Sequence, residues 1–280
     1  MVASQPESDS PRPDDTPAAG RSSREQRAAA EGFGSDASRY DRTRPDYPDE
    51  LVQRILVTSP GPDLLDVGCG TGIASRQFRS AGCTVLGIDP DPRMAEVARQ
   101  SGIATEIATF EDWDPAGRTY DIVIAAQSWH WVDLVAGAEK AAQVLRPNGR
   151  LAVFWNAFDP PQDLREAFAE VFRRVLPESP FGAFWARPAL DTYRAGSVRA
   201  ADAMRRVGAF GEPEEWLFQW ELPYSRAEWL DLVPTTGGFT QNPPALQQQL
   251  LDGLGAAVDA VGGSFVMSYS TVTATAKRLA

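Results

Sequence analysis

Residues 65–72 read LDVGCGTG and join a predicted buried strand, Leu64–Val67, to a predicted helix, Ile73–Ser80. Three glycines at alternate positions of this segment allow the backbone to turn tightly and a ligand to touch the main chain. The first turn of the following helix offers free N–H groups to a negative group. The segment therefore predicts a ligand-binding turn at the end of a buried strand.

Strands and helices alternate on both sides of this turn. The other expected strands of this part of the chain are Thr84–Ile88, Ile103–Ala108, Tyr120–Ala126 and Leu151–Trp155. The other expected helices are Glu50–Val57, the segment that Asp91 caps and Gly102 ends, and Asp133–Leu145, which Pro147-Asn148-Gly149 stops. Such alternation is typical of a doubly wound, Rossmann-like α/β fold with a mainly parallel sheet.

The pattern changes after residue 156. Residues 156–206 favour helices, Glu214–Leu222 favours a strand, and Ser225 is placed to cap a short helix. A further helix is expected at Ala245–Ala260, and the alternating end of the chain, FVMSYSTVTATAKR, predicts a long closing strand. We therefore expect an α/β fold with a mostly parallel sheet of about seven strands, an antiparallel closing strand and a helical cover.

Composition and charge exclude several classes of function. The 280 residues carry 27 Lys and Arg against 38 Asp and Glu, so the net charge is −11 and phosphate backbones or anionic membrane surfaces are unsuited as main partners. One histidine and two cysteines exclude multi-histidine and four-cysteine zinc sites. Because the chain shows neither a membrane-spanning apolar run nor a secretory signal, we expect a cytoplasmic protein.

Two acidic residues distinguish the glycine turn from a dinucleotide site. The dinucleotide pattern is G-x-G-x-x-G, whereas the third glycine here comes one residue earlier. Asp66, just before the turn, would repel a pyrophosphate and suits a ligand that carries a cation. Asp89, at the end of the second strand, can accept hydrogen bonds from both hydroxyls of a ribose. A ligand with a ribose, a cation and no phosphate matches S-adenosylmethionine.

The order strand, DVGCGTG, helix, strand, GIDP resembles the class I S-adenosylmethionine-dependent methyltransferases. Over roughly residues 33–155 the chain is similar to the small-molecule branch that includes ubiquinone/menaquinone and trans-aconitate methyltransferases. The resemblance implies S-adenosyl-L-methionine as cofactor. It also implies a set of cofactor contacts, with the glycine turn beneath the methionine part, Asp66 near its amino group and Asp89 at the ribose. The residues of this set are Asp66, Gly68, Cys69, Gly70, Gly72, Asp89, Pro90 and Met94.

A second family segment usually reads like G-D-A-E and is Ala108-Thr109-Phe110-Glu111 here. The usual Asp is replaced by Thr109, so the adenine contact falls to the backbone N–H of Phe110, or to Glu111 or Asp112. The segment that contains Tyr40 and Arg44 resembles the family's N-terminal lid, which often contacts the carboxylate of the ligand. Gln127, in the loop after the strand Tyr120–Ala126, joins the expected cofactor contacts.

This likeness divides the chain into three segments. Residues 29–155 are expected to form the cofactor-binding Rossmann-like half. Residues 156–280 are expected to form the helical cover with substrate-binding insertions, together with the last two strands of the same sheet. Residues 1–28 are rich in Ser, Pro, Asp and Arg and bury too little surface to order themselves, so we expect a disordered tail, with an ordered arm on a partner as the alternative.

The loop AQSWHW, residues 126–131, lies at the edge of the sheet where ligands bind in such folds. His130 is the candidate catalytic base, with an ordinary pKa near ~6.5, and the alternative is a packed residue that shapes the loop. Of Trp129 and Trp131, one is expected to line the pocket and the other to pack in the core. Trp155 and Asn156 end the next strand and are expected to face the same crevice, so the two pairs form the candidate substrate-binding set.

The sequence therefore predicts in-line methyl transfer from S-adenosylmethionine to a small-molecule acceptor, preferably an oxygen nucleophile. The sulfonium already activates the methyl group, so an alcohol, phenol or amine acceptor needs a base, whereas a carboxylate needs none. Aromatic residues in the expected cover favour an apolar or aromatic acceptor: Phe158, Phe168, Phe172, Phe181, Phe184 and Trp185.

Several alternatives stay open or are set aside. A methyltransferase-like module that holds the cofactor without turnover is the main competitor, and a nicotinamide dehydrogenase comes third. Asn242-Pro243-Pro244-Ala245 only partly resembles the N-P-P-Y motif of DNA methyltransferases, and the net charge opposes DNA. The acidic group at Glu111, Asp112 and Asp114 lacks ligand-spaced partners, so no metal is expected. A homodimer is among the oligomeric states that remain open.

Overall fold

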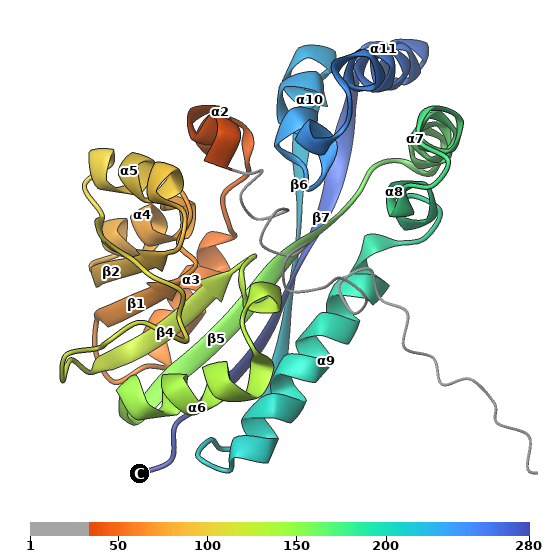
Figure 1. The fold of residues 1–280 in the computed structure, drawn as a ribbon. Helices are drawn as coiled ribbons and strands as arrows, with labels where there is room; N and C mark the ends of the chain where they lie inside the picture. Colours follow the sequence, from red (N-terminus) through yellow and green to blue (C-terminus); the bar gives the residue numbers. More distant parts are fainter. Residues whose placement is uncertain (1–33) are drawn as a thin grey trace, which may run out of the picture.

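One seven-stranded sheet runs through residues 34–280, the part of the chain that the computed structural model describes (Figure 1). The strand order is β3-β2-β1-β4-β5-β7-β6. The strands are β1 Asp63–Val67, β2 Thr84–Asp89, β3 Ala104–Ile107, β4 Tyr120–Ala126, β5 Leu145–Asp159, β6 Glu214–Ser225 and β7 Ser264–Lys277. The tail expected at residues 1–28 lies outside the described residues.

Strand directions confirm the predicted architecture. The pairs β1–β2, β2–β3, β1–β4 and β4–β5 are parallel. Strand β7 is antiparallel to both of its neighbours, β5 and β6, and is therefore the reversed strand of the sheet. The chain thus forms the expected mostly parallel sheet with an antiparallel closing strand.

Helices cover both faces of the sheet and one of its ends. The α-helices are α2 Ala37–Thr43, α3 Asp49–Val57, α4 Ile73–Ser80, α5 Pro92–Gln100, α6 Leu134–Val144, α7 Gln162–Val175, α8 Pro180–Phe184, α9 Ala189–Val207, α10 Arg226–Leu232 and α11 Pro244–Ala260. Short 3₁₀ turns are η1 Gly34–Asp36, η2 Trp129–Trp131, η3 Val233–Thr235 and η4 Phe239–Gln241. None of the helices in residues 34–280 is long and apolar enough to cross a membrane.

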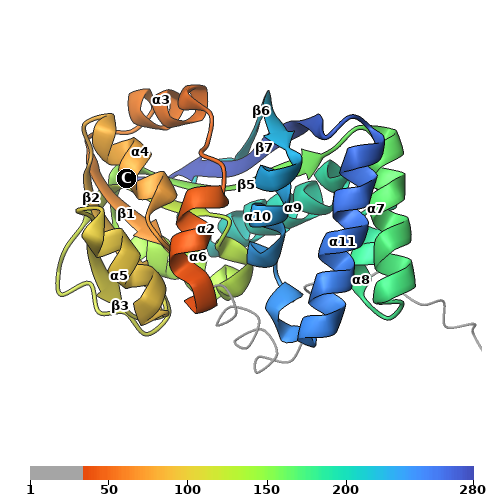
Figure 2. The same cartoon turned by 90° about the horizontal axis from the view of Figure 1, so that it is seen from above.

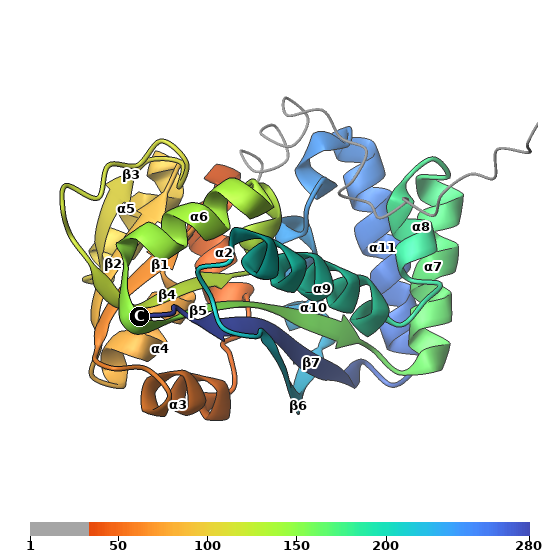
Figure 3. The ribbon, with the colours of Figure 1, turned by 90° about the horizontal axis from the view of Figure 1, so that it is seen from below.

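Alternating side chains of the central strands build a separate core on each face. Val123 and Ala125 of β4 point into a core that includes residues of α6 and α9. Ile122 and Ile124 of the same strand point to the opposite face, into a core formed with α3 and α4. Figure 3 shows α6 and α9 on one side of the sheet and α3 on the other. Residues 122–126 of β4 are therefore all apolar because both faces of the strand are buried.

The cover consists of helices α7, α8, α10 and α11, which lie beyond the carboxyl ends of the parallel strands (Figures 1 and 2). A third core holds it together, in which Phe168 of α7 and Trp229 of α10 stack with ring centroids 5.3 Å apart. Helix α2 lies between α5 of the Rossmann-like half and α10 of the cover (Figure 2). The N-terminal segment thereby connects the two parts of the molecule.

Strand β5 is longer than the expected strand Leu151–Trp155. It begins directly after α6, and Asn148 adopts a left-handed backbone conformation with φ 64°, so the Pro-Asn-Gly segment forms an irregularity within the strand. At the other end, residues 156–159, expected to be helical, pair with Ser268–Thr271 of β7. The long antiparallel partner extends β5 beyond the point where local sequence predicts its end.

Candidate cofactor and acceptor site

A large cavity of about 1250 Å³ lies at the carboxyl ends of β1, β2 and β4, below the cover. We call the lining residues that fall between Val67 and Val132 the turn wall. The lining residues that fall between Phe158 and Leu254 are called the cover wall. Most of the predicted site residues line this cavity, namely Tyr40, Arg44, Gly68, Cys69, Gly70, Asp89, Pro90, Met94, Thr109, Phe110, Glu111, Gln127, His130 and Trp131. The lining of the cavity lacks the other five predicted site residues, which are Asp66, Gly72, Trp129, Trp155 and Asn156.

The glycine turn packs directly against the loop after β4. Gly68 has φ +66°, and a Cβ atom placed on it would lie only 2.5 Å from Cβ of Ser128. The hydroxyl of Ser128 donates a hydrogen bond to the carbonyl of Val67. The close approach of these two loops therefore requires glycine at position 68 for both conformational and steric reasons.

The carboxylate of Asp89 is aimed into the cavity by two backbone groups. The N–H of Gly70 donates to Oδ2 and the N–H of Asp91 donates to Oδ1, each over 2.8 Å. Asp89 is only 8% exposed, and this burial raises its pKa to about 6, although the two backbone hydrogen bonds oppose the shift. Each oxygen retains acceptor capacity, so the side chain can bind a ligand with paired hydroxyl groups.

Asp66 lies behind the turn and is completely buried. Its Oδ2 accepts a 2.6 Å hydrogen bond from the hydroxyl of Ser75, and its Oδ1 has no partner among the described residues. Burial raises the pKa of Asp66 to about 7. A buried carboxylate oxygen without a partner is an arrangement that a nearby cationic ligand would stabilise.

The three aromatic residues of the loop after β4 have different surroundings, in the core or at the cavity. Trp129 is fully buried and packs against Phe110, with ring centroids 6.2 Å apart, whereas Trp131 lines the cavity beside His130. The loop begins at Gln127, whose backbone adopts a strained left-handed conformation with φ 57°. Trp131 is therefore the cavity residue of the pair and Trp129 the core residue.

His130 receives a hydrogen bond from Trp155. The indole Nε1–H of Trp155, which is 4% exposed, donates to Nδ1 of His130 over 3.3 Å. The imidazole is exposed to the cavity, but the surrounding protein removes it from bulk water and lowers its pKa to about 4. Trp155 therefore acts on the cavity through His130 rather than as part of its lining.

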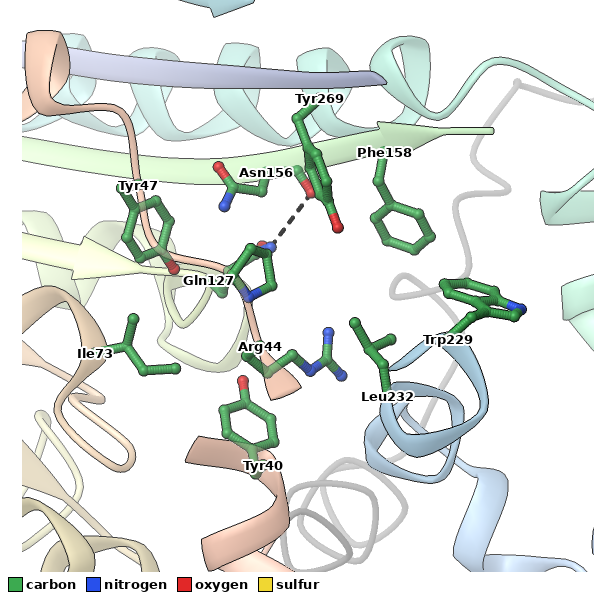
Figure 4. A pocket seen from close by; sticks show the side chains of 11 residues that line it. Tyr40, Arg44, Tyr47, Ile73, Gln127, Asn156, Phe158, Trp229, Leu232 and Tyr269 are labelled. Atoms are coloured by element: carbon green, nitrogen blue, oxygen red, sulfur yellow. Dashed lines mark hydrogen bonds between the residues drawn. The ribbon is translucent and has the colours of Figure 1, made fainter. Parts of the chain in front are cut away.

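Asn156 lines a small cavity of about 40 Å³ that shares Tyr40, Arg44 and Gln127 with the large one (Figure 4). Its amide nitrogen donates to the carbonyl of Asp46 over 3.2 Å, and its amide oxygen accepts from Thr271 over 2.7 Å. The side-chain amide of Gln127 donates to the main-chain carbonyl of Asn156 over 3.4 Å. Asn156 thus joins the lid, β5 and β7.

The lid segment is fixed to the cover by arginine contacts. Arg44 donates to both the hydroxyl and the carbonyl of Thr235, and its guanidinium lies 4.9 Å from the ring centre of Tyr40. Arg39 and Arg42 pair with one carboxylate, Asp231 of α10, at 2.8 and 2.9 Å. In Figure 4 the Arg44 side chain extends toward Leu232 and Trp229 of the cover.

The cover wall is mainly aromatic and includes residues that sequence reasoning missed. Of the expected aromatic set, all but Phe168 line the cavity, and Phe168 is buried in the core of the cover. Tyr193 of α9 and Trp229 of α10 also line it, and Tyr269 of β7 lines the small cavity. No local pattern marks these residues, because elements far apart in the sequence bring them together. Among residues 34–280, no cluster of three or more His, Cys, Asp or Glu side chains is placed to hold a metal ion.

Comparison with known proteins places this chain among methyltransferases. The family model described as "Methyltransferase domain" matches residues 65–153. An uncharacterized methyltransferase from Mycobacterium tuberculosis is 37% identical over 129 residues, which cover 45% of this chain and 53% of that protein. A malonyl-[acyl-carrier protein] O-methyltransferase from Enterobacter lignolyticus is 31% identical over 183 residues, covering 61% of this chain and 69% of that enzyme. The chain spans about half the length of the mycobacterial relative.

A solved structure from Anaeromyxobacter dehalogenans, proposed to be a type II methyltransferase, shares the fold. Its TM-score is 0.57 at 19% sequence identity, and the match covers 84% of this chain and 98% of that one. This likeness shows a shared fold. It supports the architecture described above.

Proposed function

The chain belongs to the S-adenosylmethionine-dependent methyltransferases, and on this premise we propose that it transfers a methyl group to an oxygen atom of a small-molecule acceptor. One observation carries the proposal: the glycine turn with Asp89 and the aromatic cover wall line the same cavity. A cofactor on the turn wall would therefore face an acceptor under the cover. Enclosure of the two reactants in one cavity provides the proximity that methyl transfer requires.

Several residues of the turn wall support the proposed cofactor site. Asp89 presents two aligned oxygens for the ribose hydroxyls, and the backbone of Gly70 approaches the cavity without a side chain. The hydroxyl of Thr109 donates to Asp112 over 2.8 Å, which leaves the adenine contact to the backbone N–H of Phe110. Pro90, Met94 and Glu111 complete this side, and Tyr40 and Arg44 contribute from the lid.

When bound, S-adenosylmethionine supplies a methyl group that its sulfonium already activates. The chain's own residues then have to hold the acceptor, exclude water and orient the reacting oxygen. The cover wall surrounds the acceptor side of the cavity with aromatic side chains, and His130 presents a polar atom at the edge of the turn wall. We propose that His130 contacts the acceptor oxygen.

Calorimetric titration of the purified full chain with S-adenosylmethionine and with its demethylated product tests the cofactor site. We expect saturable binding of both ligands and no binding of a nicotinamide dinucleotide. Absence of binding in protein shown to be folded would overturn the proposal. Binding without transfer of a labelled methyl group to any acceptor in a broad panel would instead favour the non-catalytic cofactor-binding module.

The division of the chain between residues 155 and 156 and a cytoplasmic location stay predictions. A homodimer is one of the oligomeric states that remain open, and the protein's mass in solution, measured by light scattering, distinguishes it from a monomer.

A further inference from the structure

We propose that the acceptor is an apolar or aromatic carboxylic acid and that the product is its methyl ester. The inference rests on the proposed function and names the substrate class of the same site. It follows from three features of the cavity: the position of its carboxylates, the hydrogen bond that His130 accepts, and the charge of its apolar half.

The cover wall contains no carboxylate among the described residues that line it. The carboxylates that line the cavity are Asp89, Asp91, Glu111 and Asp112, all on the turn wall. Each already accepts hydrogen bonds. Asp89 accepts them from two backbone N–H groups and Asp91 from Arg93. Glu111 accepts one from the N–H of Asp133, and Asp112 one from the hydroxyl of Thr109. Methylation of an alcohol, a phenol or a protonated amine needs a group that removes a proton. No carboxylate is placed to serve an acceptor under the cover.

His130 is also unable to act as this base in the observed arrangement. An indole N–H is only a donor, so Nδ1 of His130 must be the acceptor of the bond from Trp155. A neutral imidazole then carries its proton on Nε2, which forms no hydrogen bond with a described residue. His130 therefore offers a hydrogen-bond donor to the cavity and no available lone pair.

Tyr193 and Tyr47, which also line the cavity, do not replace the missing base. Burial raises the pKa of Tyr193 to about 12 and raises the pKa of Tyr47 well above its ordinary value. Both hydroxyls are therefore neutral and protonated at pH 7. The acceptor must consequently arrive with its nucleophilic oxygen already ionised, as a carboxylate does, with an ordinary pKa near ~4.

Charge and polarity of the cavity favour such an acceptor. Arg44 lines both the large and the small cavity, and its guanidinium extends toward the cover wall (Figure 4). Its positive charge acts across an apolar space that includes Phe158 and Trp229, where electrostatic attraction is weakly screened. A carboxylate with an apolar body would place its charge near Arg44 and His130 and its body against the aromatic side chains.

The reaction then needs no proton transfer. A carboxylate oxygen of the acceptor forms the new C–O bond with its own lone pair, while the electron pair of the C–S bond goes to sulfur. The negative charge of the acceptor and the positive charge of the sulfonium both disappear. Loss of opposite charges is favoured in a cavity from which water is excluded.

Matched pairs of acceptors test the proposal with methyl-labelled S-adenosylmethionine and the full chain. The acids are 3-phenylpropionate, indole-3-acetate, 1-naphthoate and decanoate, and the controls are the corresponding alcohols and amines. We expect label that mild alkali releases as volatile methanol, with rates for the acids at least 100-fold above those for the controls. Alkali-stable label on an alcohol or amine would overturn the proposal, as would absence of ester from every acid while the cofactor still binds. Failure of cofactor binding would refute the proposed function itself.

Two substitutions of His130 separate a donor from a base. His130→Gln retains an N–H group near the position of Nε2, and we expect ester formation within about 10-fold of wild type. His130→Ala removes the donor, and we expect a loss of about 100-fold, typical of one hydrogen bond to a reacting oxygen. Both variants should bind the demethylated cofactor with unchanged affinity. Equal, near-complete loss of turnover in both variants would indicate a base and contradict the proposal.

Discussion

The indole N–H of Trp155 donates a hydrogen bond to Nδ1 of His130 over 3.3 Å. The two residues are 25 positions apart: His130 lies in η2, after the end of β4, and Trp155 lies in β5, next to Phe154, the last residue that pairs with β4. This single bond decides which nitrogen of the imidazole carries the proton. It is the observation on which we propose that His130 acts as a hydrogen-bond donor rather than as a base.

Nitrogen NMR can test this tautomer directly, because His130 is the only histidine of the chain. We expect a protonated Nε2 and an unprotonated Nδ1 at neutral pH. Since the surrounding protein removes the imidazole from bulk water and lowers the pKa of His130 to about 4, its signals should not titrate between pH 5.5 and 8. The measurement requires protein from which any histidine tag has been removed.

Trp155→Phe provides the matched control for this experiment, because it keeps an aromatic ring but removes the N–H donor. We expect a mixture of the two tautomers in the variant. A wild-type imidazole that titrates near pH 6.5, or one that carries its proton on Nδ1, would contradict the assignment.

Asp89→Asn should weaken cofactor binding. The substitution removes the charge and replaces one acceptor oxygen by an amide nitrogen, which only donates, while the size of the side chain is retained. Hydrogen bonds to charged groups contribute about 1.5–3 kcal/mol each, so we expect Kd to rise by about 10- to 100-fold in calorimetry. Glu96→Gln, on the exposed surface of α5, is the control. An affinity within twofold of wild type for Asp89→Asn would refute the ribose contact.

Gly68→Ala and Gly117→Ala separate steric from conformational requirements of glycine. Both positions have positive φ, +66° and +77°, but a Cβ atom at Gly117 meets no atom within 4 Å, whereas one at Gly68 lies 2.5 Å from Ser128. We expect a loss of about 1 kcal/mol in the free energy of unfolding for Gly117→Ala. For Gly68→Ala we expect roughly 2–4 kcal/mol, because overpacking adds to the backbone strain. Urea denaturation of the two variants measures the difference, and equal losses would show that Ser128 moves without cost.

Asp66 should make the protein less stable as the pH rises. Its pKa is about 7 in the folded protein and 3.8 ordinarily, so between these values the folded state holds a proton that the unfolded state has released. The free energy of unfolding therefore falls as the pH increases from about 4 to about 7. Asp89, whose pKa burial raises to about 6, acts in the same direction.

Asp66→Asn removes the larger of these contributions. We expect the fall in Tm between pH 5 and pH 8 to be smaller in the variant than in wild type, as measured by calorimetric scanning. Asp252→Asn, on the exposed surface of α11, should leave the pH dependence unchanged. A wild-type slope in Asp66→Asn would show that the carboxylate is ionised at no cost in the folded protein.

Local sequence determines most of the Rossmann-like half. The expected helix Ile73–Ser80 and the expected strand Tyr120–Ala126 have the observed bounds, because glycines, caps and apolar runs mark their ends. Strand β5 differs, because its last residues pair with β7, more than a hundred positions away. Its length therefore depends on a partner that local patterns do not reveal.

The sequence by itself also predicted Gly68, Gly70 and Asp89, which line the turn side of the cavity, because these residues lie at fixed spacings around short elements. Only the tertiary structure decided which tryptophan of the loop faces the cavity, which nitrogen of His130 holds the proton, and which aromatic residues form the cover wall. Tyr193, Trp229 and Tyr269 come from two helices and a strand with no common motif. The reason is physical: a turn is shaped by consecutive residues, whereas a cavity wall is shaped by the packing of elements that are distant in the chain.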